Sequence, residues 1–231
     1  TELIMLWDAG TEVNEAPYSG PNQPLNGGAE TGAAEGVIAP FTNSTRALPL
    51  AADLAEFTVG RIDNTYVITF TNRSGASGAL DTPLSPLFFA THNHAWELFE
   101  SDTLNKAVGL EALAEEGSAT TLINTTSTDA NTEFVGTATI VDETTQQFTL
   151  SPTADYPYLS VASMVVRSND AFVAFPEGIR LVREDGTVRS SAIVERELNS
   201  LLTVWDAGTE VNQVPGAGDA QPGNGAPLTG E

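Results

Sequence analysis

Short runs of apolar residues with a period of two dominate the chain from Phe57 onward. In the run Tyr66–Asn72, Tyr66, Ile68 and Phe70 fall on one face, which is the period of a half-buried β-strand. The run before it, Phe57–Ile62, is separated from it by the pair Asp63-Asn64. Two β-rich runs joined by such a pair predict a β-hairpin.

The same reading predicts a largely β fold for the remainder of the chain. The further strand candidates are Leu84–Ala90, Ala95–Phe99, Phe134–Val141, Gln147–Leu150, Tyr158–Val166, Ala171–Phe175, Ile179–Val182, Ser191–Val194 and Leu201–Trp205. One helix is predicted at Leu104–Glu116, where apolar residues fall close to one face and Gly117 supplies the stop. Many short strands, one short helix and 20 glycines predict an all-β fold, an antiparallel β-sandwich.

An internal repeat divides the chain. Trp7–Asn14 reads WDAGTEVN and Trp205–Asn212 repeats it, each residue 198 positions after its counterpart. We interpret this as one full unit preceded by the tail of another. Residues 1–36 would be that tail, 37–56 a linker or loosely packed segment, and 57–231 the β-sandwich. A short motif duplicated inside a single domain is the alternative.

Charge and composition exclude several classes of function. The formal net charge is -22, from 31 acidic and 9 basic residues, which all but excludes nucleic-acid binding. No apolar run approaches the ~18 residues that a membrane-spanning helix needs. The absence of cysteine excludes disulfides, thiolate metal sites and cysteine nucleophiles. The acidic surface attracts cations, although a purely solubilising role is an equal alternative.

Two acidic loops are candidates for a metal site. Asp206 and Glu210 stand four residues apart around Gly208, and Asp170 ends the sequence Ser-Asn-Asp between two predicted strands. If both loops lie at the same end of the sandwich, the three carboxylates meet. Such a cluster is unfavourable without a cation, because like charges raise one another's pKa, and Ca²⁺ accepts irregular oxygen ligands from loops. The alternative for the Asp206 loop is a solvated acidic turn.

The two loops together resemble a known family. Met164–Phe172, reading MVVRSNDAF, followed by WDAGTEVN is similar to the paired signature of the spondin N-terminal domain family, over about Phe57 to Asn212. The resemblance implies a C2-like antiparallel β-sandwich with one bound Ca²⁺. It also implies Asp170, Asp206 and Glu210 as ligands, with a backbone carbonyl nearby. Glu210 is one methylene longer than the Asp usual in animal members, and their disulfides are missing here.

The first copy of the motif contains a partial second set of ligands, Asp8 and Glu12. These two carboxylates have no third partner, because the chain has a single Ser-Asn-Asp loop. The apolar run that begins at Leu3 likewise has no sheet of its own. We therefore expect residues 1–36 to complete a sandwich supplied by another unit, covalently linked or separate.

Other chemistry is less well supported by the sequence. His92 and His94 alternate next to Glu97, which is a possible zinc arrangement, but we favour a structural role for His92. No Gly-x-Ser-x-Gly motif is present, and we expect no catalytic activity. The acidic residues of the predicted helix are expected to form a solvated face: Glu111, Glu115 and Glu116.

The sequence therefore predicts a secreted, extracellular or cell-surface structural or adhesion module that binds calcium. Its expected partners are copies of itself, in tandem or head to tail, and matrix or surface polysaccharide. The alternative is a calcium-dependent module that binds glycans or lipid headgroups. A glycan binder should expose aromatic side chains near the metal loops, where Phe172 and Trp205 stand.

Overall fold

The structure, a computed structural model, describes residues 37–40, 50–75, 82–103, 105–168, 170–175 and 177–209. Its strands are β1 (Ala39–Pro40), β2 (Ala55–Ile62), β3 (Thr65–Asn72), β4 (Phe88–His92), β5 (Thr132–Thr137), β6 (Thr139–Ile140), β7 (Thr145–Leu150), β8 (Tyr158–Met164), β9 (Ala171–Ala174), β10 (Ile179–Arg180) and β11 (Thr203–Asp206). Its helices are α1 (Ala51–Leu54), α2 (Leu110–Glu116), α3 (Thr120–Thr126) and α4 (Ser191–Leu201).

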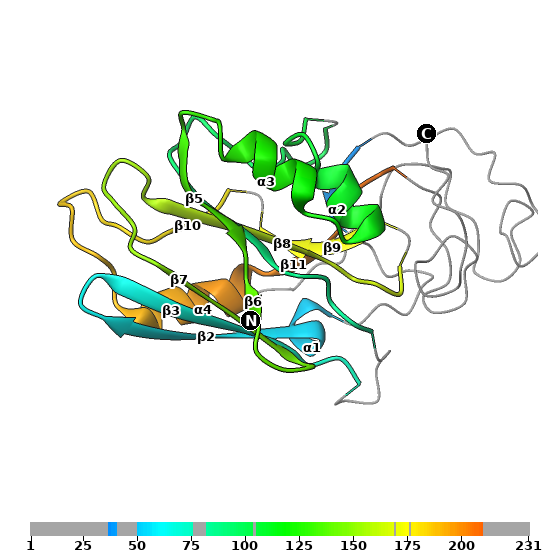
Figure 1. Ribbon diagram of the computed structural model, residues 1–231, viewed down its shortest axis with the longest axis horizontal. Helices are drawn as coiled ribbons and strands as arrows, with labels where there is room; N and C mark the ends of the chain where they lie inside the picture. The colour runs from blue at the N-terminus through cyan, green and yellow to red at the C-terminus, as the bar shows by residue number, and fades with distance from the viewer. Residues whose placement is uncertain are drawn as a thin grey trace, which may run out of the picture.

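The strands form two antiparallel sheets, which confirms the predicted all-β sandwich (Figure 1). The larger sheet has the order β1-β11-β9-β8-β4-β5, with β10 paired to β8. The smaller sheet has the order β2-β3-β7-β6. The predicted hairpin is also confirmed, since Ile62 pairs with Thr65 across the two-residue turn, where Asp63 has a φ of 52°. A positive φ at this position is typical of the tight turns that join twisted strands.

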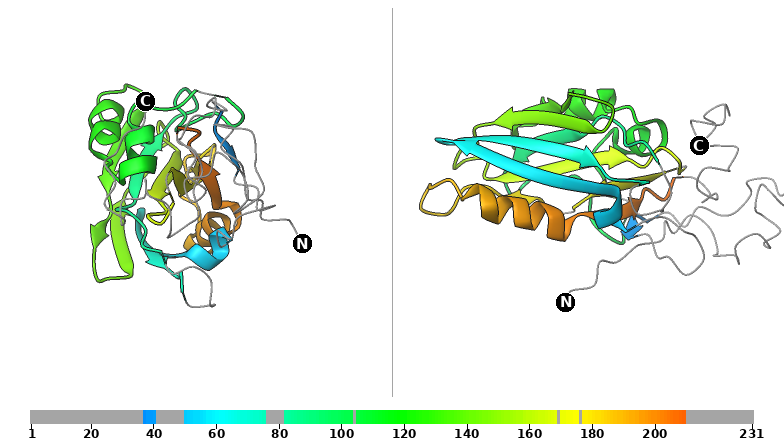
Figure 2. Two further views of the ribbon diagram at one scale, coloured as in Figure 1. Left: turned by 90° about the vertical axis from the view of Figure 1, so that its right-hand side faces the viewer. Right: turned by 90° about the horizontal axis from the view of Figure 1, so that it is seen from below.

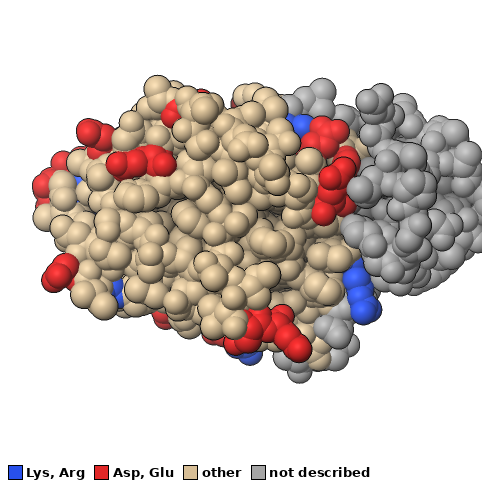
Figure 3. Space-filling view, viewed as in Figure 1, with Lys and Arg blue, Asp and Glu red and all other residues tan. Residues whose placement is uncertain are grey.

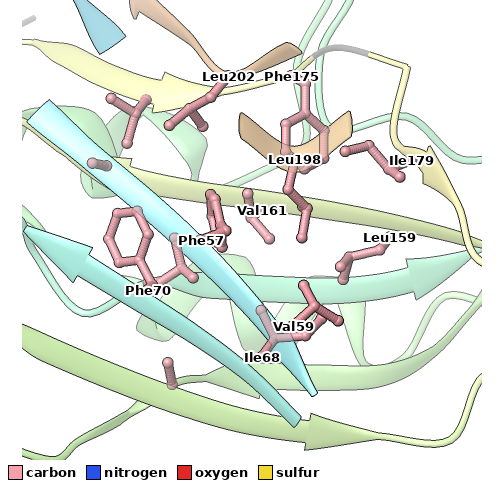
Figure 4. Packing of buried hydrophobic residues seen from close by; sticks show 14 of the residues in the cluster. Phe57, Val59, Ile68, Phe70, Leu159, Val161, Phe175, Ile179, Leu198 and Leu202 are labelled. Atoms are coloured by element: carbon pink, nitrogen blue, oxygen red, sulfur yellow. The ribbon is translucent and has the colours of Figure 1, made fainter. Parts of the chain in front are cut away.

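The main core lies between the two sheets (Figure 4). The smaller sheet contributes alternate residues of β2 and β3, among them Phe57, Ile68 and Phe70, and these face Leu159 and Val161 of β8. Phe57 and Phe70 pack with their ring centroids 4.9 Å apart. Each of these side chains is almost fully removed from water, and such burial stabilises a fold by roughly 1.5–3 kcal/mol per large apolar side chain.

A second core covers the outer face of the larger sheet. Helices α2 and α3 lie there (Figure 1), and Leu110, Leu113 and Leu122 pack against Phe88 and Phe172. The middle strands of this sheet are therefore buried on both faces, and every residue of β9 is buried. This explains why β8 and β9 have nearly continuous apolar sequences, whereas β3 alternates.

Helix α4 was not predicted, and Ser191–Val194 is its first turn rather than a strand. The helix runs along β2, which is an edge strand (Figure 2). The Asn199 side chain accepts a hydrogen bond from the Phe57 backbone N–H and donates one to the Phe57 carbonyl, each at 2.8 Å. The Glu195 carboxylate accepts from the Val59 N–H at 2.7 Å. These tertiary bonds cover the β2 edge and outweigh the β-propensity of the apolar start of the helix.

Other differences from the sequence reading have local causes. The described residues form four helices rather than one. Helix α2 begins only at Leu110, because Lys106 is held in a β-bridge with Phe99 and Gly109 has a φ of 95°. That bridge is all that forms in the predicted strand Ala95–Phe99.

The segment expected as a linker, 37–56, contributes to the body of the domain where it is described. Ile38, Ala51 and Leu54 are buried, and β1 pairs with β11. Residues 1–36 and 210–231 lie outside the described residues, so the tail segment, Asp8, Glu12 and Glu210 stay predictions of the sequence. Among the described helices, none has the length and hydropathy to cross a membrane.

The packing of α4 predicts that two leucines of this helix contribute differently to the free energy of unfolding. Leu198 is fully buried against the main core, and Leu201 is 51% exposed. We expect Leu198→Ala to lower the free energy of unfolding by about 2–5 kcal/mol, because it leaves a cavity. Leu201→Ala should change it by about 0.5 kcal/mol or less. Urea unfolding of both variants measures this, and equal losses would contradict the packing described for α4.

Candidate functional site

The candidate site lies where β9 begins and β11 ends. The two strands are paired antiparallel, with Asp206 opposite Ala171 as the last cross-strand pair. The Ala207 N–H continues the ladder by donating to the Asp170 carbonyl at 3.1 Å. Because α2 and the second sheet cover the two faces of this strand pair, Asp170 and Asp206 are both 0% exposed. Two carboxylates are thus buried at one end of the larger sheet.

The loop after β11 connects the two aspartates. Gly208 has a φ of 68°, which turns the chain sharply and favours glycine. The Asp206 Oδ1 accepts from the Gly208 N–H at 3.0 Å, and the Asp170 Oδ2 accepts from the Thr209 N–H at 3.1 Å. Since consecutive backbone nitrogens are separated by less than ~4 Å, these two carboxylate oxygens lie within roughly 10 Å of one another.

The two side chains reach this loop from opposite faces of the sheet. Asp206 follows Leu202 and Val204 in the row that faces the main core, whereas Asp170 precedes Phe172 in the row that faces the helices. A cation shared by both carboxylates would therefore have to sit beyond the last strand pair, at the end of the sheet.

Ser168 fixes the loop that presents Asp170. Its hydroxyl donates to the Val165 carbonyl at 2.6 Å and accepts from the Ala171 N–H at 3.0 Å. The backbone N–H of Ser168 donates to the same Val165 carbonyl at 2.9 Å. The serine of the Ser-Asn-Asp sequence thus closes the turn between β8 and β9 and holds Asp170 at the start of β9.

The aromatic residues beside the aspartates are core residues. Trp205 is 4% exposed and donates from its indole N–H to the Ala174 carbonyl at 3.1 Å. Its ring packs edge to face against Phe99, with the ring centroids 4.7 Å apart. Phe99 packs in the same way against Phe172, with a centroid separation of 5.5 Å. These contacts anchor the loop to the core, and they leave neither Trp205 nor Phe172 exposed to contact a ligand.

Glu115 of α2 is a third acidic group in this region. Burial raises the pKa of the Glu115 carboxyl, and the negative charges of Glu111 and Asp170 raise it further, while Thr209 and Lys106 oppose the shift. The Thr209 hydroxyl is buried and makes no hydrogen bond of normal geometry. It nevertheless lies close enough to the Glu115 carboxyl to lower its pKa. The expected solvated face is thus corrected for Glu115, which is half-buried, while Glu111 and Glu116 are exposed.

The structure describes two of the three predicted calcium ligands. Asp170 and Asp206 lie at the same end of the sheet, and Glu210 lies outside the described residues. Within the described ranges, no group of three or more His, Asp or Glu side chains surrounds a common point. The donors present are all oxygen atoms, which is the chemistry that Ca²⁺ requires. These two aspartates would supply carboxylate oxygens to a calcium site, and other ligands would have to complete it.

The contacts of His92 are those of a structural residue, the role that we favoured over a zinc ligand. This side chain is buried, and its Nδ1 donates to the Asn93 carbonyl at 2.9 Å. Its Nε2 accepts from the Ser160 hydroxyl at 2.9 Å, so both ring nitrogens are occupied. Burial lowers the pKa of His92, which keeps the ring neutral. His94, in contrast, is exposed and bonds through Nε2 to the Tyr158 hydroxyl. Ser160, which donates to His92, is fully buried.

Comparison with known proteins adds no family. The sequence matches no protein-family model and no curated protein. The resemblance to the spondin N-terminal domain family therefore stays a prediction from the two loop sequences.

The position of Glu115 predicts a stabilising substitution. A carboxyl whose pKa is raised by folding destabilises the folded state once it ionises, and this destabilisation is complete above the folded-state pKa. Without calcium, Glu115→Gln should therefore raise the Tm at pH 7 by about 2 °C. The gain should shrink as the pH falls through the raised pKa toward the ordinary Glu value. The exposed neighbour provides the control, Glu116→Gln, and a Tm gain as large in the control would contradict the assignment.

Proposed function

We propose that this chain is an extracellular structural or adhesion module that binds calcium at the end of its larger sheet. One observation supports the proposal most directly. Asp170 and Asp206 are completely buried, and their carboxylates accept hydrogen bonds from two successive backbone N–H groups, Asp206 from Gly208 and Asp170 from Thr209. In this proposal, both aspartates and Glu210 hold the ion. Bound calcium would link the β8–β9 loop to the loop after β11.

Electrostatics supports a cation at this position. Burial is the main cause of the raised pKa of Glu115, and the negative charge of Asp170 adds to it, so these two groups lie close enough to interact electrostatically. Like charges in a poorly solvated region destabilise the fold, and a divalent ion of opposite charge reverses the sign of that interaction. A site built from carboxylate oxygens on irregular loops favours Ca²⁺ over Mg²⁺, which prefers strict octahedral geometry and keeps its waters.

The composition supports an extracellular setting. The net charge is -22, and on the face shown in Figure 3 acidic side chains outnumber basic ones and lie around an uncharged centre. Such a surface stays soluble and attracts divalent cations. Extracellular calcium modules bind with Kd values of roughly 10⁻⁴–10⁻³ M, a range that a site with a few carboxylates reaches.

The sequence repeat supports assembly between units. In the fold, β11 fills a slot between β9 and β1 that requires aliphatic residues at 202 and 204, a tryptophan at 205 and the Asp-Ala-Gly-Thr loop. Residues 4–11, reading IMLWDAGT, meet each of these requirements, with Ile4 and Leu6 at the aliphatic positions. The slot in the same chain is already filled. Residues 4–11 therefore suit an equivalent slot in another unit, in tandem or head to tail.

Binding of glycans or lipid headgroups at the aspartate loops is the less favoured alternative. A glycan site there would use Trp205 or Phe172, and both side chains belong to the core. No feature of the described loops favours a lipid headgroup over calcium alone.

The calcium proposal predicts a thermal shift. By mass action, calcium at 100 times its Kd should stabilise the protein by about 2.7 kcal/mol, which is a Tm increase of roughly 5–10 °C for a domain of this size. Asp206→Asn and Asp170→Asn should each remove most of this increase. The exposed loop residue Asp142 is the matched control, and Asp142→Asn should retain it.

Calcium titrations by calorimetry should rank the calcium affinities of the variants in the same order as their calcium-dependent Tm increases. Equal melting curves for the wild-type protein in chelator and in calcium at 100 times the expected Kd, roughly 10–100 mM, would contradict the proposal. So would a calcium shift that survives in both aspartate variants.

The assembly proposal predicts the behaviour of a truncated chain. Deletion of residues 1–36 should leave a folded monomer that still shows the calcium-dependent Tm shift, because the described body begins after the deletion. The full chain should form larger species in light scattering after size exclusion, and Trp7→Ala should abolish them, since it removes the aromatic residue that the slot requires. A monomeric full chain, or a truncated chain that unfolds, would contradict this part of the proposal.

A further inference from the structure

A polar hollow of ≈ 410 Å³ lies on the helix side of the larger sheet, and it plays no part in the proposed calcium site. Three segments enclose it: residues 94–99 after β4, residues 105–108 before α2, and residues 125–129 at the end of α3. Its volume falls in the range of roughly 300–1,000 Å³ that is usual for sites of small ligands.

Hydrogen bonds between the three segments hold the hollow open. The Ala107 N–H donates to the Leu98 carbonyl at 2.8 Å, next to the β-bridge between Phe99 and Lys106. The Thr125 hydroxyl donates to the Val108 carbonyl at 2.9 Å. A cavity whose walls are bonded to one another in this way is formed before a ligand arrives, and a ligand has little ordering cost to offset.

Apolar and aromatic side chains also line the hollow, and one of them carries a polar atom. Phe99 and Ala107 contribute apolar surface, and Trp96 is 8% exposed. The indole N–H of Trp96 makes no hydrogen bond with any described residue, and it is not sealed from solvent. A buried indole with an available N–H is a donor that suits a hydroxyl or carbonyl oxygen of a bound ligand.

Charges around the hollow select against anions. Two carboxylates line it, Glu97 and Asp129. Asp129 uses its Oδ1 to accept from the Asn131 backbone N–H at 2.8 Å and side-chain amide at 3.0 Å, and its Oδ2 has no partner among the described residues. Lys106, the cation of the lining, is paired with Glu111 at 3.0 Å. The lining therefore offers two carboxylate acceptors, with the Trp96 indole, the Asn105 amide and the ion-paired Lys106 as donors.

We propose that this hollow binds a neutral saccharide unit. A pyranose ring presents apolar C–H faces together with several hydroxyl donors and acceptors. The apolar side chains of the lining match the former, and Glu97, Asp129 and the Trp96 N–H match the latter. Carboxylates that accept from vicinal hydroxyls give strong hydrogen bonds, while uronic acids and sulfated sugars are repelled. The site is independent of calcium.

Saturation-transfer NMR and calorimetric titration test this site on the whole chain. The neutral probes are galactose, mannose and N-acetylglucosamine with their short oligomers, and the comparison probes are galacturonic acid oligomers and the cation methylammonium. We expect a neutral sugar to bind with a millimolar Kd and the acidic oligomers not to bind. Chelation of calcium should leave the Kd unchanged, which separates this result from the aspartate site.

Three variants locate the bound sugar. The double variant Glu97→Ala/Asp129→Ala should weaken binding by tenfold or more. Trp96→Phe should weaken it by roughly three- to tenfold, the effect of one hydrogen bond, with the melting temperature recorded to confirm folding. Glu143→Ala, at an exposed turn away from the hollow, should have no effect. Absence of binding by all neutral probes, preference for an acidic or cationic probe, or a Kd unchanged in the double variant would each overturn the proposal.

Discussion

The pairing of β9 with β11, under cover on both faces, is the constraint from which the rest of the structure follows. The smaller sheet and α4 close one face of this strand pair, and α2 closes the other. The residues at the end of the β9–β11 strand pair are therefore removed from water. In this chain the residues at that end are Asp170 and Asp206, both acidic and both fully buried. The architecture thus determines that their carboxylates must be satisfied from within.

The backbone supplies part of that satisfaction, and it does so through a glycine. Gly208 turns the chain so that its own N–H and that of Thr209 each point at one carboxylate. Hydrogen bonds to carboxylates are strong, but they do not cancel the repulsion between like charges, and the negative charge of Asp170 adds to the rise that burial produces in the pKa of Glu115. A bound cation would complete the balance and cross-link the two loops. Trp205 anchors this loop to the core through its contact with Phe99.

The sequence predicted those features that depend on residues close to one another along the chain. The β2–β3 hairpin follows from the period-two pattern and its two-residue turn, and Asp170 and Asp206 follow from short loop sequences. Helix α4 could not be predicted in this way, because its place depends on Asn199 and Glu195 meeting the β2 edge from more than a hundred residues away. The participation of Glu115 depends in the same way on α2 packing against β9.

A structure from crystals grown in calcium, with anomalous difference maps recorded at an X-ray energy just above the calcium K edge, is the decisive test of the calcium site. Our account predicts a single calcium peak at the end of the larger sheet, within about 2.3–2.6 Å of carboxylate oxygens from both Asp170 and Asp206. A map in which both carboxylates contact protein donors alone, with no calcium peak beside them, would contradict it.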